Sequence, residues 1–461
     1  MALNALDRHI ALVGFMGAGK STIAPLVAER IGRRSVDVDD ELGVDIPALF
    51  AQGEEAFRAV EEPRTCELLA AFEPAVLALG GGSIKSAAIR DALGERAFTV
   101  LLDVDVDEAW NRVKASDRPL AQDEIAFRRL NDERRPLYGG VADATAGDVD
   151  GVILAAAGIH HELGALERLG ELVPGDGAVA LVADSTVMGI HGPRAQEALG
   201  DRLVSIHELP PGEEAKHIRV VERLWSDLTL DRGGTVVALG GGSVTDTAGF
   251  AAATYLRGVP WVSVPTTLVG QVDAAIGGKT AVDIPQGKNL AGAFHWPARV
   301  VIDEALLETL PKSERRQGQA ELVKTRLLAG TELDVRGAAA YKAALCLRDP
   351  HDRGVRQWLN LGHTFAHALE AAAGFELPHG DAVALGLLAA LRLSHRDTST
   401  VERELDPRRV AVDRDRAWEA LLRDKKRAGE TINLVLLGED GPGVESRPAP
   451  EVRAALDTLI A

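Results

Sequence analysis

Short apolar runs alternate with helical stretches along most of the chain and predict parallel sheets. Residues 10–13 form such a run, and a glycine-rich turn and helical periodicity at residues 23–31 follow at once. Runs at residues 76–79, 178–182 and 235–239 have the same character. Further helices are expected among the later strands, at residues 162–172, 193–199 and 218–230. Strand and helix in alternation are typical of α/β domains.

The first turn carries a phosphate-binding sequence, GxxxxGK[ST], in the strand–turn–helix context that it needs. Its glycines let backbone N–H groups face phosphates, and the helix that follows adds the positive end of its dipole. Lys20 is expected to reach the outer phosphates and Ser21 to hold Mg²⁺, so the predicted cofactor is ATP with Mg²⁺. The residues expected to bind the nucleotide are Gly14, Gly17, Ala18, Gly19, Lys20, Ser21 and Thr22.

A second candidate site begins with two histidines four residues apart, His363 and His367, in a run rich in Ala and Leu. A helix from about residue 364 places both imidazoles on one face, where they can hold a divalent metal. Glu321 and His379 can complete its shell from elsewhere. Thr364 stands where the helical zinc pair of metalloproteases has a glutamate, which excludes that class. The alternative is two surface or core histidines at helical spacing, and the pattern alone leaves it open.

Composition narrows the class of protein. A chain of 461 residues exceeds one ordinary core, so two or three domains are expected. Its net charge of −18 argues against nucleic acid and membranes as partners, because both need a basic face. Cys66 and Cys346 stand far apart, the first residues do not resemble a signal peptide, and the apolar run at residues 382–391 is too short to span a bilayer. A reducing cytoplasm is the expected location.

Behind the phosphate-binding loop, an ordered series of short motifs carries carboxylates, arginines and glycines. The motifs are VDVDD with Asp37 and Asp39, FR with Arg58, GGG at residues 80–82, DRPL with Arg118 and ERRPLY with Arg134. Taken singly, an arginine of this kind is most often a solvated surface charge. In this order, the series resembles shikimate kinase over nearly the whole stretch.

The resemblance to shikimate kinase implies a role for each motif. Asp37 lies on the magnesium side, and Asp39 binds the hydroxyls of shikimate. Arg58 and Arg134 clamp its carboxylate, a group that suits bidentate arginine. Arg118 sits on a lid over the phosphates. The pocket is lined by Gly80, Gly81 and Gly82.

The kinase-like region is expected to end near residue 150. Kinases of this family usually continue after the PLY tyrosine through another strand and a terminal helix. Residues 142–148 are interpreted here as the start of a new domain, so the usual terminal helix is expected to be missing. The triplet at residues 240–242 repeats GGG, but its flanks differ and no phosphate-binding loop precedes it, so we reject an internal repeat. As a lone dinucleotide signal, GGGxxxDxxG is weak.

Residues from about 155 onward carry a longer series of motifs. PGEEAK begins at residue 211, YLRG at 255, PTTL at 265, QVDAAIGGKT at 271, GKNLAGAF at 287 and AELVK at 320. Together with the histidine helix, they resemble 3-dehydroquinate synthase. The resemblance implies an NAD domain, a helical domain and an active site in the cleft between them. Enzymes of that family convert a seven-carbon phosphorylated keto sugar acid to 3-dehydroquinate and phosphate. They use NAD, which is regenerated in each turnover, and a metal that is usually zinc or cobalt.

Residue roles in the synthase-like region follow from the resemblance by position. The implied NAD contacts are Asp184, Glu213, Lys216, Gly241, Gly242, Ser243, Asp246, Thr266, Thr267, Lys279 and Lys288. The implied metal ligands are Glu321, His363 and His379, whereas His367 works on the substrate. The other substrate-binding and catalytic positions are Arg257, Asp273, Lys279, Lys288, Asn289, Lys324, Lys342, Arg356 and Asn360, with the pair Lys425 and Lys426.

Departures from the family pattern lie in the helical part. The segment between Lys324 and Lys342 is shorter than usual, and Thr325 and Arg326 replace a Tyr-Gly pair.

The predicted architecture is a P-loop kinase domain at residues 1–150, a Rossmann-like NAD-binding α/β domain at 151–310, and an all-α metal- and substrate-binding domain at 311–461.

The predicted function is a bifunctional enzyme of the shikimate pathway, which leads to chorismate and the aromatic amino acids. It phosphorylates shikimate with ATP and converts 3-deoxy-D-arabino-heptulosonate 7-phosphate to 3-dehydroquinate. Its expected partners are small molecules, with a homo-oligomer through the synthase half. The alternatives are another sugar-phosphate cyclase, a polyol dehydrogenase, or an inactive scaffold for the kinase. The intact ligand set argues against the scaffold.

Overall fold

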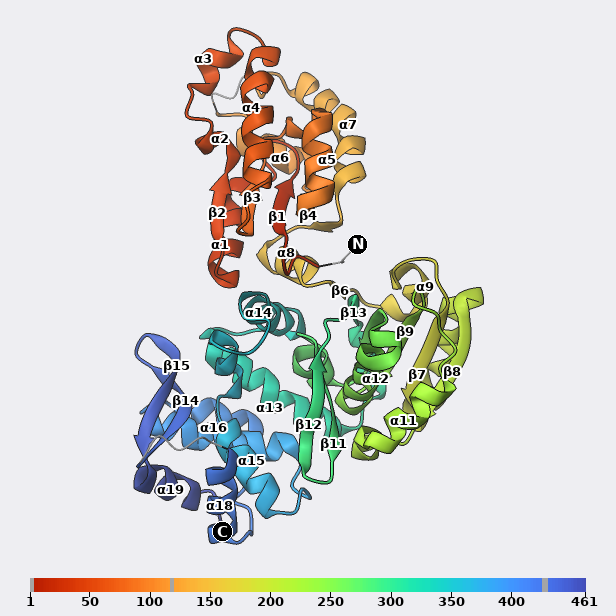
Figure 1. The fold of residues 1–461 in the computed structure, drawn as a ribbon. Helices are drawn as coiled ribbons and strands as arrows, with labels where there is room; N and C mark the ends of the chain where they lie inside the picture. Colours follow the sequence, from red (N-terminus) through yellow and green to blue (C-terminus); the bar gives the residue numbers. More distant parts are fainter. Residues whose placement is uncertain (1–3, 117–119, 425–429) are drawn as a thin grey trace. The chain divides into compact units, whose positions relative to one another are not determined.

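The computed structural model of the protein describes residues 4–116, 120–424 and 430–461. The chain forms two compact units, Met1–His160 with Ala343–Arg348 and His161–Lys342 with Asp349–Ala461. Each unit has a parallel sheet whose central strands are buried (Figure 1). A strand that is covered on both faces needs apolar residues at every position, which is why these strands are continuous apolar runs in the sequence.

The sheet of the first unit has five parallel strands in the order β2-β3-β1-β4-β5. Their bounds are β1 (His9–Val13), β2 (Arg34–Asp37), β3 (Ala75–Ala78), β4 (Ala97–Leu102) and β5 (Ala144–Ala146). The helices are α1 (Lys20–Ile31), α2 (Val38–Glu41), α3 (Ile46–Phe50), α4 (Glu54–Leu69), α5 (Ala87–Arg96), α6 (Val106–Val113), α7 (Glu124–Val141) and α8 (Val149–Ala156). Strand β1 lies in the middle, so the loop that follows it is at the centre of the carboxyl edge of the sheet, where α/β folds bind ligands.

The end of the first unit differs from the prediction. Strand β5 pairs with β4, and α8 packs beside it and against α1, so the strand and the terminal helix that were expected to be missing are present. Helix α8 spans the position near residue 150 where the boundary was expected, and the compact unit ends at His160. The strand has three residues and the helix eight, with buried Val152, Ile153 and Leu154. Elements this short give weak periodicity, which explains the error.

The sheet of the second unit has six strands in the order β6-β13-β10-β9-β7-β8. Their bounds are β6 (Ile159–His161), β7 (Val179–Asp184), β8 (Leu203–Leu209), β9 (Thr235–Gly240), β10 (Trp261–Pro265) and β13 (Arg299–Ile302). The associated helices are α9 (Leu169–Leu172), α10 (Ser185–Leu199), α11 (Ile218–Asp227) and α12 (Gly242–Thr254). A separate antiparallel hairpin consists of β11 (Lys279–Ile284) and β12 (Gly287–Phe294). The predicted strands β7 and β9 are direct parallel neighbours.

The rest of the second unit is mainly helical. Its helices are α13 (Lys312–Ala329), α15 (His363–Ala372), α16 (His379–Leu393), α17 (Ser399–Leu405), α18 (Arg414–Asp424) and α19 (Ala449–Asp457), together with the part of α14 (Val335–Arg348) that precedes Ala343. A hairpin of β14 (Thr431–Gly438) and β15 (Gly441–Pro448), which was not predicted, belongs to this part. Helix α16 is apolar and buried along its middle, and its charged residues Asp381 and Arg392 lie near its two ends.

Two glycines set how closely the histidine-bearing helices approach each other. A Cβ at Gly386 of α16 would lie 2.1 Å from the carbonyl oxygen of Gly362, the residue before α15. Gly362 itself has φ +77°, a conformation that favours glycine. The close packing of α15 on α16 brings the first residues of both helices, His363 and His379, toward each other.

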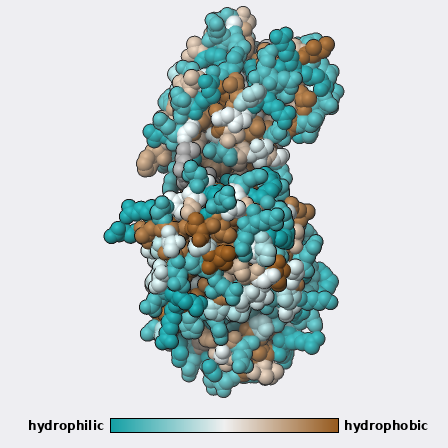
Figure 2. Space-filling view, turned by 90° about the vertical axis from the view of Figure 1, so that its right-hand side faces the viewer, coloured by the Kyte–Doolittle hydropathy of each residue, from teal (hydrophilic) through white to brown (hydrophobic). Residues whose placement is uncertain are grey.

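The surface carries both hydrophilic and hydrophobic side chains. Figure 2 shows one face on which hydrophilic side chains predominate and hydrophobic ones form patches. None of the helices in the described residues combines the length and the apolar character that a membrane crossing requires.

Candidate active sites

The phosphate-binding loop connects β1 to α1. Gly17 and Gly19 have φ values of +83° and +92°, and a Cβ at Gly17 would press on the carbonyl oxygen of Ala109. Lys20 is the first residue of α1, and its Nζ donates to the carbonyl oxygens of Gly14 (2.7 Å) and Phe15 (3.1 Å). Ser21 and Thr22, next along the helix, are exposed, whereas Ala18 is buried. The loop therefore presents a cation and a hydroxyl at a helix N-terminus, the arrangement that binds phosphates.

A cavity of about 350 Å³ lies beside this loop. It gathers all the described residues that were predicted to bind the substrate of the kinase-like unit: Asp39, Arg58, Gly80, Gly81, Gly82 and Arg134. Apolar side chains, among them Phe50 and Phe57, line the rest of it. Asp37 caps α2 by accepting from the backbone N–H of Asp39. Arg118 lies outside the described residues.

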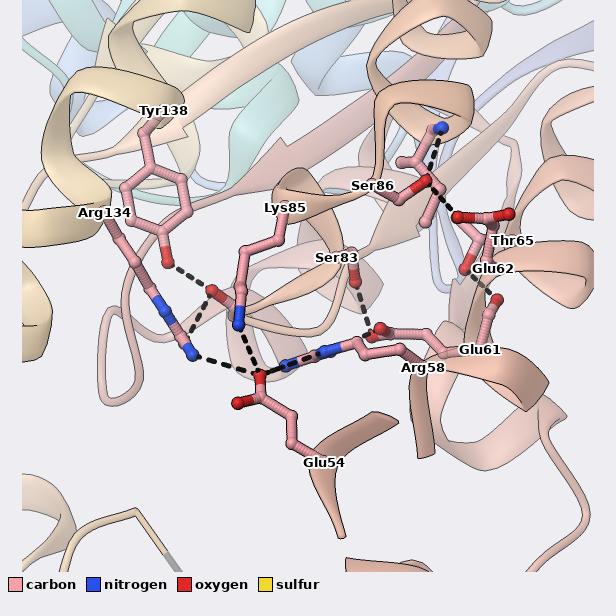
Figure 3. A network of polar contacts seen from close by, with 12 residues as sticks. Glu54, Arg58, Glu61, Glu62, Thr65, Ser83, Lys85, Ser86, Arg134 and Tyr138 are labelled. Atoms are coloured by element: carbon pink, nitrogen blue, oxygen red, sulfur yellow. Dashed lines mark hydrogen bonds and ion pairs between the residues drawn. The ribbon is translucent and has the colours of Figure 1, made fainter. Parts of the chain in front are cut away.

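Both arginines of this cavity are held by polar partners (Figure 3). Arg58 pairs with Glu61, whose other oxygen accepts from the Ser83 hydroxyl at 2.6 Å. Arg134 donates to the carbonyl oxygen of Gly81 at 3.1 Å. A Cβ at Gly82 would overlap the Arg58 guanidinium, so a larger residue here would push the arginine out of its present position.

Sequence reasoning missed three residues of this network. Glu54 and Glu61 lie four residues before and three residues after Arg58 on α4, and both contact it. That spacing is a readable signal, because residues three or four apart are neighbours on a helix. Tyr138 donates to the same Gly81 carbonyl as Arg134, and burial raises the pKa of Tyr138 to about 12, so its hydroxyl stays protonated as a donor.

In the second unit, Glu321, His363 and His379 converge on one point. The Nε2 atoms of His363 and His379 lie 3.3 Å and 3.1 Å from the same oxygen of Glu321. One ligand atom from each of the three lies within 4.8 Å of the others, a spacing that fits a metal ion. His367, one helical turn after His363, is not part of this group, and its ring meets that of His363 edge-on at 5.6 Å.

The outward nitrogens of both histidines are engaged in a way that suits metal ligands. Nδ1 of His363 lies 3.2 Å from the carbonyl oxygen of Leu361, and Nδ1 of His379 lies 3.1 Å from Glu370. Such partners fix the ring so that Nε2 faces the metal. Burial and Lys324 lower the pKa of His363. Burial also disfavours the charged form of His379, but its hydrogen bonds to Glu321 and Glu370 raise the pKa to about 10.

A row of alternating charges leads away from the cluster of Glu321, His363 and His379. Lys324 is 1% exposed, and its Nζ lies 2.5 Å from Glu321 and 3.7 Å from Asp273. Lys342 donates to Asp273 at 2.7 Å. Burial opposes the charge of Asp273, but Lys342 and Lys324 hold its pKa below the usual value. Burial likewise opposes the charge of Lys324, and Glu321 with Asp273 raises its pKa.

The row ends at a cavity of about 620 Å³. The predicted residues that line it are Asp246, Asp273, Lys279, Asn289, Lys342 and Arg356. Lys279 pairs with Asp352, and Arg356 is buried and donates to the carbonyl oxygen of Pro350 at 3.1 Å. The cavity therefore combines lysines and an arginine with carboxylates and an amide, a lining that suits a phosphorylated, hydroxylated acid.

The predicted NAD residues form a second polar group on the sheet side of the unit. Buried Lys216 pairs with Asp246 at 2.7 Å and also donates to Asn289, while exposed Glu213 pairs with Lys288 at 3.1 Å and accepts from Ser243 at 3.4 Å. Gly241 and Gly242 begin α12, and Cβ atoms there would meet Thr267 and Ala274. Thr266 is buried, and Asp184 caps α10 through the N–H groups of Thr186 and Val187. A glycine turn before a helix N-terminus fits a dinucleotide phosphate.

Some predicted residues stand apart from these groups. Arg257 is exposed, has φ +70° and does not line the cavity. Asn360 ends a short 3₁₀ helix just before α15. Lys425 and Lys426 lie outside the described residues. Sequence reasoning missed Glu370, although it lies seven residues after His363 and thus on the same face of α15.

Comparisons with known proteins match the first part of the chain to a kinase family and the rest to a synthase family. Residues 206–317 match the family model of the 3-dehydroquinate synthase N-terminal domain, residues 299–426 that of its C-terminal domain, and residues 16–153 that of shikimate kinase. The chain is 41% identical to 3-dehydroquinate synthase of Symbiobacterium thermophilum over 305 residues, which cover 60% of this chain and 80% of that protein.

Solved structures are similar to the same region. A crystal structure of 2-deoxy-scyllo-inosose synthase with carbaglucose-6-phosphate, NAD⁺ and Co²⁺ is 23% identical, covers 65% of this chain and 95% of its own, and has a TM-score of 0.58. The structure of 2-epi-5-epi-valiolone synthase from Streptomyces hygroscopicus with NAD⁺ and Zn²⁺ is 26% identical, with corresponding coverages of 65% and 96% and a TM-score of 0.54.

Proposed function

The chain belongs to the 3-dehydroquinate synthase family and carries a shikimate kinase domain before it, and from this premise we propose which of its residues perform the two reactions. The enzyme phosphorylates shikimate with ATP and Mg²⁺, and it converts 3-deoxy-D-arabino-heptulosonate 7-phosphate to 3-dehydroquinate and phosphate with NAD and a divalent metal. The predicted bifunctional fusion is thereby confirmed. Matches to synthase domains over residues 206–426 do not favour a polyol dehydrogenase or an inactive scaffold.

In the kinase domain, the observation that carries the assignment of residues is the cavity beside the phosphate-binding loop. Lys20 neutralises the outer phosphates, and Ser21, with Asp37, is on the magnesium side. Arg58 and Arg134 bind the shikimate carboxylate, and Asp39 binds its hydroxyls. Arg118, which lies outside the described residues, is a further candidate for phosphate binding from the family pattern. Because this reaction needs little covalent help, these residues act by position and by charge.

In the synthase domain, Glu321, His363 and His379 hold the metal. Their donor atoms converge, and the second nitrogen of each imidazole is engaged, so the three side chains fit a divalent ion, Zn²⁺ or Co²⁺. When bound, the metal supplies a positive charge that polarises oxygens of the substrate. His367 lies one turn along the same face of α15, where an imidazole can take up and return a proton.

The cavity at the end of the row of charges that begins at Glu321 receives the substrate. Lys342 and Arg356 line it and bind the anionic groups, Asp273 holds Lys324 and Lys342 in place, and Asn289 and Lys279 lie at its hairpin wall. Lys288, Arg257, Asn360, Lys425 and Lys426 are further candidates from the family pattern. The nucleotide is held where Glu213, Lys216, Ser243 and Asp246 surround the start of α12, with Asp184, Thr266 and Thr267 beside it.

We also propose the domain limits and setting of the enzyme. The kinase domain extends to about residue 160, the NAD-binding domain from there to about residue 310, and the helical domain to residue 461. The protein works in the cytoplasm, and its synthase half forms a homo-oligomer.

Two assays test the assignment. Phosphate release from the seven-carbon substrate without ATP measures the synthase, and ATP-dependent phosphorylation of shikimate measures the kinase. Treatment with a chelator should remove the first activity and leave the second after Mg²⁺ is restored, and Zn²⁺ or Co²⁺ should restore the first. A synthase that keeps full activity with no detectable metal would contradict the role of Glu321, His363 and His379.

A further inference from the structure

One carboxylate oxygen in the kinase domain meets three cationic side chains. Oε1 of Glu54 accepts from Nη2 of Arg58 at 3.0 Å and from Nζ of Lys85 at 3.1 Å, and Nη2 of Arg134 lies 3.6 Å away (Figure 3). Arg58 and Arg134 are the two arginines that we assign to the carboxylate of shikimate. Glu54 therefore makes with them the contacts that a carboxylate ligand would make.

Each of the three nitrogens of Arg58 directs one donor at a protein carboxylate. Its Nε and Nη2 face Glu54, and its Nη1 faces Glu61. Arg134 gives Nη1 to the carbonyl oxygen of Gly81. A guanidinium has five N–H donors in a fixed plane, and Nε carries only one of them. A ligand that binds Arg58 in parallel through Nε and Nη2 therefore competes with Glu54.

Of these two glutamates, Glu54 is the one that can leave. The Glu61 side chain is 1% exposed and also accepts from Ser83, so its position is fixed from two sides. The Glu54 side chain is 33% exposed, does not line the cavity, and belongs to the first residue of α4. Gly53 before it has φ +119° and open space around the position of a Cβ. Glu54 can thus turn into solvent without repacking the core.

We propose that Glu54 is an internal competitor for the substrate carboxylate: it holds the Arg58–Arg134 pair when the pocket is empty and gives up Arg58 when shikimate binds. This inference rests on the assignment of Arg58 and Arg134 to the carboxylate of the substrate. Glu54 sets the affinity for the acid, because each binding event exchanges one ionised carboxylate for another. It keeps two adjacent guanidinium groups compensated in the empty enzyme.

The test is the substitution Glu54→Gln in the full chain, which removes the charge and keeps the size. We expect the KM for shikimate to fall about fivefold, the effect of roughly 1 kcal/mol that partly exposed ion pairs reach, while kcat changes by less than twofold. The methyl ester of shikimate, measured as a competitive inhibitor, should show no such gain, since it has no carboxylate to exchange. A KM for shikimate that is unchanged or higher, or an equal gain for the ester, would overturn the proposal.

Two controls separate this proposal from its premise. Glu55→Gln removes the same charge from the same helical turn at an exposed position, and it should leave the KM for shikimate within twofold of the parent value. Arg58→Lys removes the bidentate fork and should raise the KM for shikimate at least tenfold. If Arg58→Lys has no effect on the KM, the assignment of the carboxylate clamp fails, whatever Glu54→Gln does. Circular dichroism of each variant checks the fold.

Discussion

The two active sites place their charges in opposite ways. In the kinase pocket, the acids that face Arg58 come from its own helix, three and four residues away, and the side chains at the rim are partly exposed. In the synthase site, Lys324 shares its helix with Glu321, but Asp273 and Lys342 come from other parts of the chain, and Lys324 among them is fully buried. A local pair at a rim can exchange its partner for a ligand. A buried network assembled across elements cannot lose a member without leaving an uncompensated charge.

This contrast suggests a division of work. The kinase transfers a phosphoryl group in one step and mainly needs cations that receive and release anions. The synthase carries its substrate through several steps in one site, so the charges of that site must stay fixed while the substrate changes. The same residue types therefore serve as exchangeable contacts in one domain and as a permanent framework in the other.

The largest expected effect concerns the two histidines of α15. His363→Ala should lose stoichiometric metal and all synthase activity, because it removes one of three converging ligands. His367→Ala should keep the metal and NAD but lose most turnover, since it removes a proton-transfer group and no ligand. Elemental analysis of both purified variants, with kinase activity as an internal check of the other domain, measures the difference. A folded His367→Ala protein without metal would mean that His367 is a ligand and that the family assignment of its role is wrong.

The second prediction tests the independence of the two sites. Lys20→Ala should abolish phosphorylation of shikimate, because Lys20 is the cation at the end of the phosphate-binding loop. Dehydroquinate formation should stay near the parent level. Both rates are measured on the same preparation, so differences in the amount of folded protein affect both rates equally. Parallel loss of both activities in a folded variant would remove the basis for comparing two separate sites.

Sequence reasoning reached the fold through the apolar strands and the sites through ordered motifs. Both signals are local: Val13 before a glycine turn, or His363 and His367 at helical spacing, can be recognised without knowing what lies nearby. Contacts across the chain were predicted only where the family resemblance supplied them, as for Glu321 with His363 and His379. Nothing near Lys324 in the sequence indicates Asp273, which lies 51 residues earlier, and the three-residue strand β5 was too short to register. Glu54 and Glu61 were within reach, because helical spacing connects them to Arg58.

The third prediction compares one lysine from each site. Lys324→Met leaves Glu321 and Asp273 without their shared cation, so the synthase part should lose about 3–5 kcal/mol of stability, the typical cost of breaking a buried ion pair. Lys85→Met in the kinase pocket removes an ion pair of Glu54 from a side chain that is 47% exposed, and less than about 1 kcal/mol is expected. Calorimetry of the full-length variants, in which the two parts can unfold separately, gives both shifts. Similar losses of stability in the two variants would contradict the contrast between a buried network in the synthase site and an exposed ion pair in the kinase pocket.

The smallest expected effect concerns a carboxylate that is neither an exchangeable ion-pair partner nor part of the buried network of charges. Backbone N–H groups hold it instead of cations. Both oxygens of Asp349 accept backbone N–H groups, from Arg353 (3.0 Å), Gly354 (2.6 Å) and Arg356 (3.2 Å), and so fix the turn that carries Arg356 into the synthase cavity. Partial burial opposes its charge, but these three donors hold the pKa of Asp349 below its usual value. A pKa that is lower in the folded state than in the unfolded state gives stability that is present above about pH 4 and is lost as the pH falls through the folded value.

Asp349→Asn keeps one acceptor oxygen and loses the charge. We expect it to cost about 1 kcal/mol at neutral pH and to raise the synthase KM about threefold, because Arg356 is held less firmly. The stability difference from the parent should be constant between pH 7 and pH 5 and should shrink below pH 4, where the parent carboxylate also becomes neutral. Asp231→Asn is the matched control, since Asp231 accepts a single N–H group, from Gly233, in an exposed turn away from both sites. It should cost less and leave the synthase KM unchanged. If Asp349→Asn leaves the synthase KM unchanged as well, the burial of Arg356 and its hydrogen bond to Pro350 are enough to position it, and the synthase framework is more rigid than its ion pairs suggest.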